Sequence, residues 1–140
     1  MKKNNITIML NCLLPLFAGA VIYYLFSPDV IFVKLIDEII GCGVHFDIVS
    51  QGNWALNILR YYVLDILWAY ALVFALYFIS GNETANLKKI FFITFVFSMA
   101  MEFLQLTPLA EGTFDISDII CEFFAEGIAV FVIKKIYGRH

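Results

Sequence analysis

The chain has 140 residues, of which 62% are hydrophobic, 17% aromatic and only 15% charged, and its formal net charge at pH 7 is -3. Soluble domains are about 45–50% apolar and about 25% charged, so this composition, with a mean hydropathy of +0.88, indicates a membrane protein. No basic patch suggests a nucleic-acid partner. The length suits one domain over residues 1–140, an all-α bundle with about four spans of roughly 20 residues each.

The first predicted span covers residues 6–26 and contains no charged residue. At about 1.5 Å per residue it would be about 30 Å long, the thickness of the hydrocarbon core of a bilayer. A signal peptide is the alternative, because Lys2 and Lys3 precede the segment and small residues occur within 17–20. The apolar run continues beyond that site to Phe26, which favours an uncleaved span.

The segment over residues 28–40 predicts a short amphipathic helix after the first span. Its apolar residues recur at helical spacing and its charged residues fall on the other side: Val30, Val33, Ile36 and Ile40 against Lys34, Asp37 and Glu38. Such a helix would lie on the membrane surface, and a re-entrant helix is the alternative. His45 follows in the same loop, beside Asp47, and is expected to be solvated or locally hydrogen-bonded rather than catalytic.

Three further spans are predicted over residues 61–79, 90–106 and 116–133. Basic residues cluster before the first span, between the second and third, and after the fourth: Lys2, Lys3, Lys88, Lys89, Lys134, Lys135 and Arg139. Since positive charge marks the cytoplasmic side of a membrane protein, both termini are predicted to be cytoplasmic. The three cysteines, Cys12, Cys42 and Cys121, lack metal-site spacing, so we expect free thiols, with no metal and no cofactor.

Polar residues interrupt the last three spans. They are Asp65 in the second, Glu102 and Gln105 in the third, and Asp115, Asp118, Glu122 and Glu126 at the start of the fourth and within it. An ionised Asp at the centre of a transmembrane helix costs about 2.5–3.5 kcal/mol on insertion scales, so intramembrane acids indicate a functional site. The four acids of the last span follow at intervals of 3, 4 and 4 residues, which places them on one side of a helix. We expect these acids to face the bundle interior in the outer half of the membrane.

Arg60 is the only base expected near these acids. Several of them should therefore be protonated or be neutralised by a bound cation. Polar residues also join transmembrane helices as structural hydrogen bonds, the role expected of Asn11, Thr94, Ser98 and Gln105. Five of the acids gather at one depth on three helices, which favours a ligand-binding site instead: Asp65, Glu102, Asp118, Glu122 and Glu126.

Residues 102–118 contain a Glu-x-x-Gln sequence, a turn with proline and a Phe-Asp-Ile-x-Asp sequence: Glu102, Gln105, Pro108, Phe114, Asp115, Ile116 and Asp118. These motifs resemble those of the VanZ-like family of small bacterial membrane proteins. Residues 57–72, with Asp65, Trp68 and Tyr70, also resemble the second helix of compact members.

The chain departs from the family pattern at three places. Members often carry an Arg before the Phe-Asp pair, where this chain has Glu111, Gly112 and Thr113, and Glu122 and Ala125 replace an Asn and a Gly. A guanidinium would suit bidentate capture of phosphate or carboxylate. Its absence favours a proton or a cation over an anionic headgroup as the ligand.

The resemblance implies a cell-envelope role in the bacterial cytoplasmic membrane, since the family's namesake is associated with low-level resistance to the glycopeptide teicoplanin. A binding protein would use the acids to hold a membrane lipid, a lipid-linked envelope precursor, a glycopeptide or another membrane protein. An intramembrane enzyme would use Glu102 and Asp118 as an acid/base pair on such a precursor. A proton-coupled carrier is a third alternative, which would require a homodimer because four spans without an inverted repeat are too few.

Overall fold

The computed structural model describes residues 2–27, 31–41, 43–45, 54–107 and 114–138. This part of the chain is helical and contains no strand. Five α-helices and one short 3-10 helix follow one another along the chain: α1 (Lys2–Phe26), α2 (Ile31–Ile40), α3 (Trp54–Ile79), η1 (Thr84–Asn86), α4 (Leu87–Leu104) and α5 (Ile116–Tyr137). The all-α prediction is therefore confirmed.

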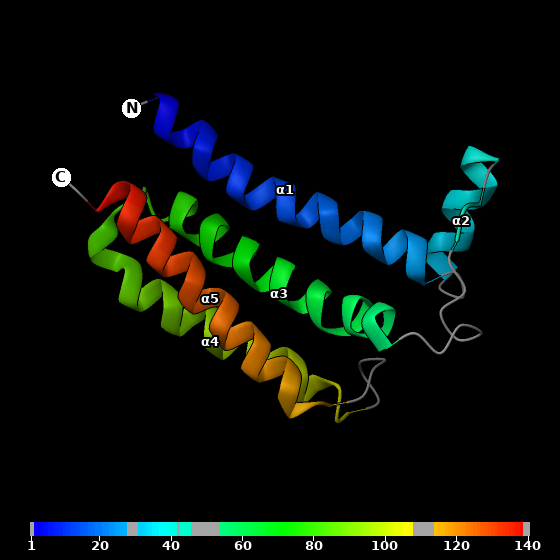
Figure 1. Cartoon of the computed structure of the whole chain (residues 1–140). Helices are drawn as coiled ribbons and strands as arrows, with labels where there is room; N and C mark the ends of the chain where they lie inside the picture. The colour runs from blue at the N-terminus through cyan, green and yellow to red at the C-terminus, as the bar shows by residue number, and fades with distance from the viewer. Residues whose placement is uncertain (1, 28–30, 42, 46–53, 108–113, 139–140) are drawn as a thin grey trace.

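The four long helices lie along one another, and the short helix α2 stands at one end of them (Figure 1). α1 packs on α3, while α5 packs on both α3 and α4. The start of α1 and the end of α5 lie at the same end of the molecule, opposite α2 (Figure 1). An even number of long helices brings the two ends of the chain together in this way.

The predicted spans fall on these four helices, but their boundaries differ. α3 begins at Trp54 rather than at residue 61, α4 ends at Leu104 rather than at 106, and α5 continues to Tyr137. A span is predicted from apolar side chains, whereas helical backbone hydrogen bonds continue into polar flanks. Among the described residues, two helical segments are long and apolar enough to cross a membrane, Asn5–Phe26 in α1 and Tyr62–Ile79 in α3.

The buried and exposed faces of α4 and α5 reverse the pattern of a water-soluble helix. On α4 the buried side chains include Thr94, Ser98 and Glu102, and on α5 they include Glu122 and Glu126. The exposed side chains on the same two helices are large and apolar, among them Phe92, Val96, Phe97, Phe103, Phe124, Ile128 and Phe131. A large exposed apolar surface over a polar interior is typical of helices in lipid.

A buried apolar cluster joins the four long helices near the chain ends. Its members are Ile8, Val73, Phe74, Tyr77, Leu87, Ile90, Ala129 and Ile133. The turn after α3 is fixed beside it by Gly81 and Asn82, which have positive φ angles of 82° and 63°. The Tyr77 hydroxyl donates to the Asn82 carbonyl at 2.8 Å, so the core also holds this turn in place. Toward the other end of the bundle, polar side chains replace apolar ones in the interior.

The amphipathic segment forms α2, as predicted, but its buried face is narrower than expected. Val33 is buried and Ile40 is exposed, and Val30 lies outside the described residues. The exposed side chains include Ile31 at 84%, Leu35 at 51% and Ile39 at 76%. These three follow at intervals of four residues, so α2 carries an apolar stripe turned away from the rest of the chain.

Candidate functional site

Asp115 starts α5 at the edge of the site. It is the N-cap of that helix, with φ -131° and ψ 122°, and its Oδ1 accepts a 2.8 Å hydrogen bond from the Ser117 backbone N–H. The hydrogen bonds from Ser117 hold the pKa of the Asp115 carboxyl below its ordinary value. Asp115 therefore has a structural role as the cap, one that the sequence pattern alone did not separate from the other acids.

Glu102 connects the end of α4 to the start of α5. Its side chain is 4% exposed. Oε1 accepts a 3.1 Å hydrogen bond from the Gln105 amide, and Oε2 accepts a longer one, 3.5 Å, from the Asp115 backbone N–H. Both oxygens of Glu102 thus have donors within the chain. Gln105 is placed by the structure as a partner of Glu102, and Pro108 and residues 111–113 lie outside the described residues.

Glu122 and Glu126 lie deeper in the bundle, 1% and 0% exposed. The Ser98 hydroxyl on α4 donates to Glu126 Oε1 at 2.9 Å, which is the helix-joining role expected of Ser98. Within the described part of the chain, Oε2 of each glutamate is buried without a hydrogen-bond partner, and so is Oδ1 of Asp118. Buried carboxylate oxygens are nearly always hydrogen-bonded, so the oxygens of Glu122 and Asp118 need a proton or an outside donor. At Glu126 the Thr94 side chain also interacts with the carboxyl group, so the need there is smaller.

Asp65 completes the group from α3. When ionised, its carboxyl interacts electrostatically with those of Asp118 and Glu102, and Glu122 interacts with Asp65, Glu102, Glu126 and Asp118. We define the acid cluster as Asp65, Glu102, Asp118, Glu122 and Glu126. The structure thus brings together the predicted acids of three helices, with Asp115 and Gln105 at their edge.

No base contacts the acid cluster within the described residues, where the one ion pair lies elsewhere. The side chain of Arg60, the base expected nearby, lies outside the described residues. In the described part of the chain, the acids therefore have no basic side chain to neutralise them, as the sequence predicted. Repulsion among like charges in a low-dielectric interior favours protonation or binding of a positive group.

Two grooves open on the flanks of the acid cluster. One, of about 390 Å³, runs between α1 and α3, and the Asp65 side chain lines it together with Tyr23, Gly19 and Trp68. The other, of about 480 Å³, runs between α3 and α5 and is lined by Tyr62, Ser117 and Cys121 among others. Asp65 is the one charged residue in the lining of the first groove, so an acid of the cluster is reached from the side of the bundle.

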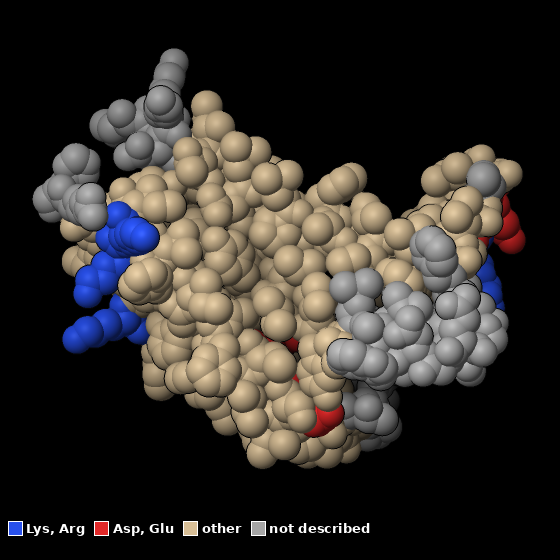
Figure 2. Space-filling model, in the orientation of Figure 1, with Lys and Arg blue, Asp and Glu red and all other residues tan. Residues whose placement is uncertain are grey.

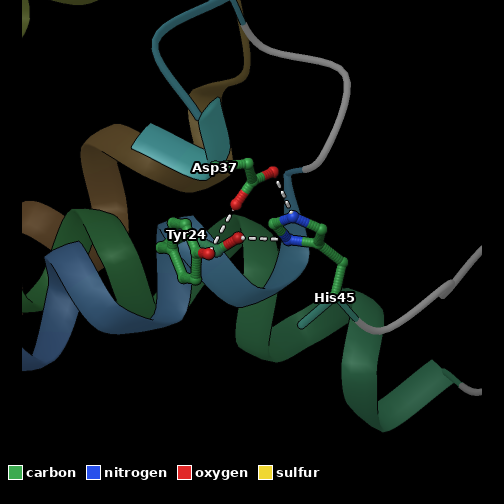
Figure 3. A network of polar contacts seen from close by, with 3 residues as sticks. All are labelled: Tyr24, Asp37 and His45. Carbon is green, nitrogen blue, oxygen red and sulfur yellow. Dashed lines mark hydrogen bonds and ion pairs between the residues drawn. The ribbon is translucent and has the colours of Figure 1, made fainter. Parts of the chain in front are cut away.

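A second polar group, which the sequence did not reveal, joins α1, α2 and the segment after α2 (Figure 3). The Tyr24 hydroxyl donates to Asp37 Oδ1 at 2.5 Å, and His45 Nε2 lies 2.7 Å from Asp37 Oδ2. His45 Nδ1 lies 3.0 Å from the Tyr24 carbonyl oxygen. Both ring nitrogens face acceptors, so a doubly protonated imidazolium satisfies both contacts. We call these three residues the Tyr24–Asp37–His45 network.

The charges in this network stabilise each other. The Tyr24 hydroxyl and the His45 ring hold the pKa of the Asp37 carboxyl below its ordinary value. The hydrogen bond to Asp37 raises the pKa of His45 above 6.5. His45 is hydrogen-bonded, as expected, but to Asp37 and not to Asp47, which lies outside the described residues. Gly43 is a feature of the sequence that fits this contact, because a Cβ at that position would lie 3.3 Å from Asp37 and from His45.

Among the described residues, no group of three or more His, Cys, Asp or Glu is arranged to hold a metal ion.

Comparisons with known proteins do not assign this chain to a family. No family model, curated protein or solved structure matches this chain. The site is therefore described by its own geometry: five carboxyl groups on three helices, three of them with a buried oxygen that lacks a partner among the described residues.

Proposed function

We propose that α1, α3, α4 and α5 all span a bacterial cytoplasmic membrane, with both chain ends in the cytoplasm and α2 lying on the outer surface. The apolar outer faces and polar inner faces of α4 and α5 support this placement. Most visible Lys and Arg side chains gather at the end of the bundle where α1 begins and α5 ends, which agrees with the positive-inside rule (Figure 2). The exposed apolar stripe of α2 favours an interfacial helix over a re-entrant one.

We propose that the acid cluster binds the polar headgroup of a membrane lipid or envelope precursor, through a cationic or hydroxyl-bearing group. The observation that carries this function is the buried Oε2 atom of Glu122, which has no hydrogen-bond partner among the described residues, with the same feature at Glu126 and Asp118. These oxygens are acceptors, so a ligand with ammonium or hydroxyl donors is complementary to them. The groove beside Asp65 would admit such a headgroup from the side while its acyl chains stay in the bilayer.

The VanZ-like resemblance supports a role of this kind in the cell envelope. Its expected residues Glu102, Asp115 and Asp118 lie together at the junction of α4 and α5, where Glu102 accepts from the Asp115 backbone. A glycopeptide antibiotic is a further candidate ligand, since it also offers hydroxyl and ammonium donors. The acidic character of the cluster favours any of these over an anionic ligand.

An intramembrane enzyme is the second candidate function. Glu102 accepts two hydrogen bonds, while Asp118 has a buried oxygen with none, and the two carboxyl groups interact electrostatically. Two carboxyl groups in different surroundings are what acid/base catalysis on a lipid-linked precursor requires. Turnover of envelope precursors by the reconstituted protein would favour this candidate over binding alone.

Lipid mass spectrometry on the purified protein tests the binding function. Wild type should retain a polar lipid or precursor that Glu122→Gln loses, because the substitution removes the charge and keeps the size of the side chain. Glu83→Gln is a matched control, since Glu83 is an exposed glutamate at the other end of the bundle. Membrane levels of all three proteins should be equal. An identical lipid complement in wild type and Glu122→Gln would contradict the proposed function.

A further inference from the structure

A separate groove lies at the basic end of the bundle, away from the acid cluster. It measures about 590 Å³ and lies between the start of α4 and the last half of α5. Leu87, Phe91 and Val130 form its apolar wall, and Lys88 and Lys134 contribute its positive charges. None of the residues of the acid cluster lines it. The groove is therefore a second site with the opposite charge.

The polarity of this groove changes along its length. Lys134 follows Gly127 by seven residues on α5, a distance of about 10 Å along the helix axis. α4 runs the opposite way, from the end of the bundle toward its middle, and on it Lys88 precedes Phe91 by three residues. Both helices thus place lysine at the end of the bundle and apolar side chains further in. A ligand that matches has an anionic head and an apolar tail.

Gly127 lines this groove, and packing within the chain does not explain its presence. A Cβ added at this position would meet nothing within 4 Å. By contrast, Ala125 and Ala129, two residues before and after it on α5, are 2% and 0% exposed. Glycine in a helix interior costs about 0.5–1 kcal/mol relative to alanine. Its absence of a side chain leaves room for something from outside the chain to approach α5 closely.

We propose that this groove binds an anionic phospholipid, with the phosphate between Lys88 and Lys134 and an acyl chain over Gly127 against Phe91 and Val130. Basic pockets between transmembrane helices on the cytoplasmic side suit such headgroups. A second copy of the chain fits less well, because symmetric packing would bring the same lysines together.

Binding of phosphatidylglycerol to the purified full-length protein, measured by native mass spectrometry with phosphatidylcholine as the zwitterionic probe, tests the charge requirement. The double variant Lys88→Gln/Lys134→Gln should bind phosphatidylglycerol about thirtyfold more weakly, equivalent to about 2 kcal/mol. The matched control is Lys89→Gln/Lys135→Gln, which removes the same charge from two neighbouring exposed lysines that do not line the groove. Equal losses in both double variants, or no loss in the first, would overturn the proposal.

Gly127→Leu tests the shape of the groove. The open space at this position lets the variant fold, which helical circular dichroism checks, while the added side chain fills the groove floor. Phosphatidylglycerol binding should fall, and the ligand of the acid cluster should be retained, so that failure of one proposal is distinguishable from failure of the other. Unchanged lipid binding would overturn the inference. So would a wild-type dimer that Gly127→Leu converts to monomers, because the occupant would then be a second copy.

Discussion

The acid cluster and the Tyr24–Asp37–His45 network handle carboxylates in opposite ways. Asp37 has a hydroxyl donor on one oxygen and an imidazole on the other, so its charge is matched within the chain. Glu122 and Glu126 are more deeply buried, yet each keeps an oxygen without a partner among the described residues. The first arrangement holds α1, α2 and the segment after α2 together. The second leaves hydrogen-bonding capacity that a proton or a donor from outside the described residues would fill.

This difference separates structural polar groups from functional ones better than burial does. Glu102 is also buried, but it resembles Asp37 in having a donor for each carboxyl oxygen. These donors are the Gln105 amide and the Asp115 backbone N–H. Within the acid cluster, Glu122 is therefore the better candidate for ligand contact and Glu102 the better candidate for holding the α4–α5 junction. Substitutions that remove one carboxyl at a time should show this division.

The largest expected effect is an opposite change in stability at two glutamates. In the ligand-free protein, Glu122→Met should raise the free energy of unfolding by about 1–3 kcal/mol, because it removes a buried acceptor that has no partner among the described residues. Glu102→Met should lower it by about 1 kcal/mol, because the Gln105 amide and the Asp115 N–H lose their acceptor. Thermal unfolding of the purified variants in detergent measures both. Ligand binding should be lost in Glu122→Met despite its greater stability.

A destabilised Glu122→Met in the ligand-free protein would break the comparison, since it would mean that the glutamate already has a stabilising partner within the chain. Glu83→Met is the control for the general effect of replacing a glutamate, because Glu83 is exposed. Its unfolding temperature should stay close to that of wild type.

A smaller, local effect is expected at α2. Asp37→Asn keeps the shape of the side chain but removes the charge that holds His45, so α2 should detach more often from the end of α1. Hydrogen exchange of the α2 amides should become faster, while exchange in α3 and α5 stays unchanged. The control is Glu38→Gln on the same helix, since Glu38 is exposed. Equal exchange rates in wild type and Asp37→Asn would show that Val33 packing alone fixes α2.

The helices and the acid stripe could be predicted from sequence because both depend on local spacing. Apolar runs define the long helices, and intervals of four residues place Asp118, Glu122 and Glu126 on one side of α5. The buried positions of Glu122 and Glu126 are those expected if α5 spans a membrane, as proposed, because exposing carboxylates to lipid is costly. What spacing could not give is the number of donors that reach each oxygen.

The missed features depend on contacts across turns. Tyr24 and His45 are 21 residues apart, and their contact requires the chain to reverse at Gly41, which has a φ of 70°. The contact of Glu102 with the Asp115 N–H likewise crosses the junction between α4 and α5. Gly127 is a different case, because its position follows from local spacing. It lies two residues from the buried Ala125, which places it on the opposite side of the helix.

The smallest expected effect is a pH dependence confined to the Tyr24–Asp37–His45 network. The pKa of His45 is raised above 6.5 by its bond to Asp37, so its contribution is complete below pH 6.5 and is lost as the pH rises through the raised value. The pKa of Asp37 is lowered below 3.8 by Tyr24 and His45, so its contribution is present above pH 3.8 and is lost as the pH falls through the lowered value.

Protection of the α2 amides should therefore be greatest between about pH 4 and 6.5. It should fall both at higher pH, as His45 loses its proton, and at lower pH, as Asp37 gains one. Hydrogen exchange, corrected for the intrinsic rate at each pH, measures this profile. His45→Gln keeps an amide donor that does not titrate, so its profile should be flat where wild type loses protection. An alkaline loss that persists in His45→Gln would have to come from the other groups in contact, and Tyr24 is the one that titrates at high pH. The network would then depend on the phenol rather than on an ion pair, and its contrast with the acid cluster would no longer be one of charge.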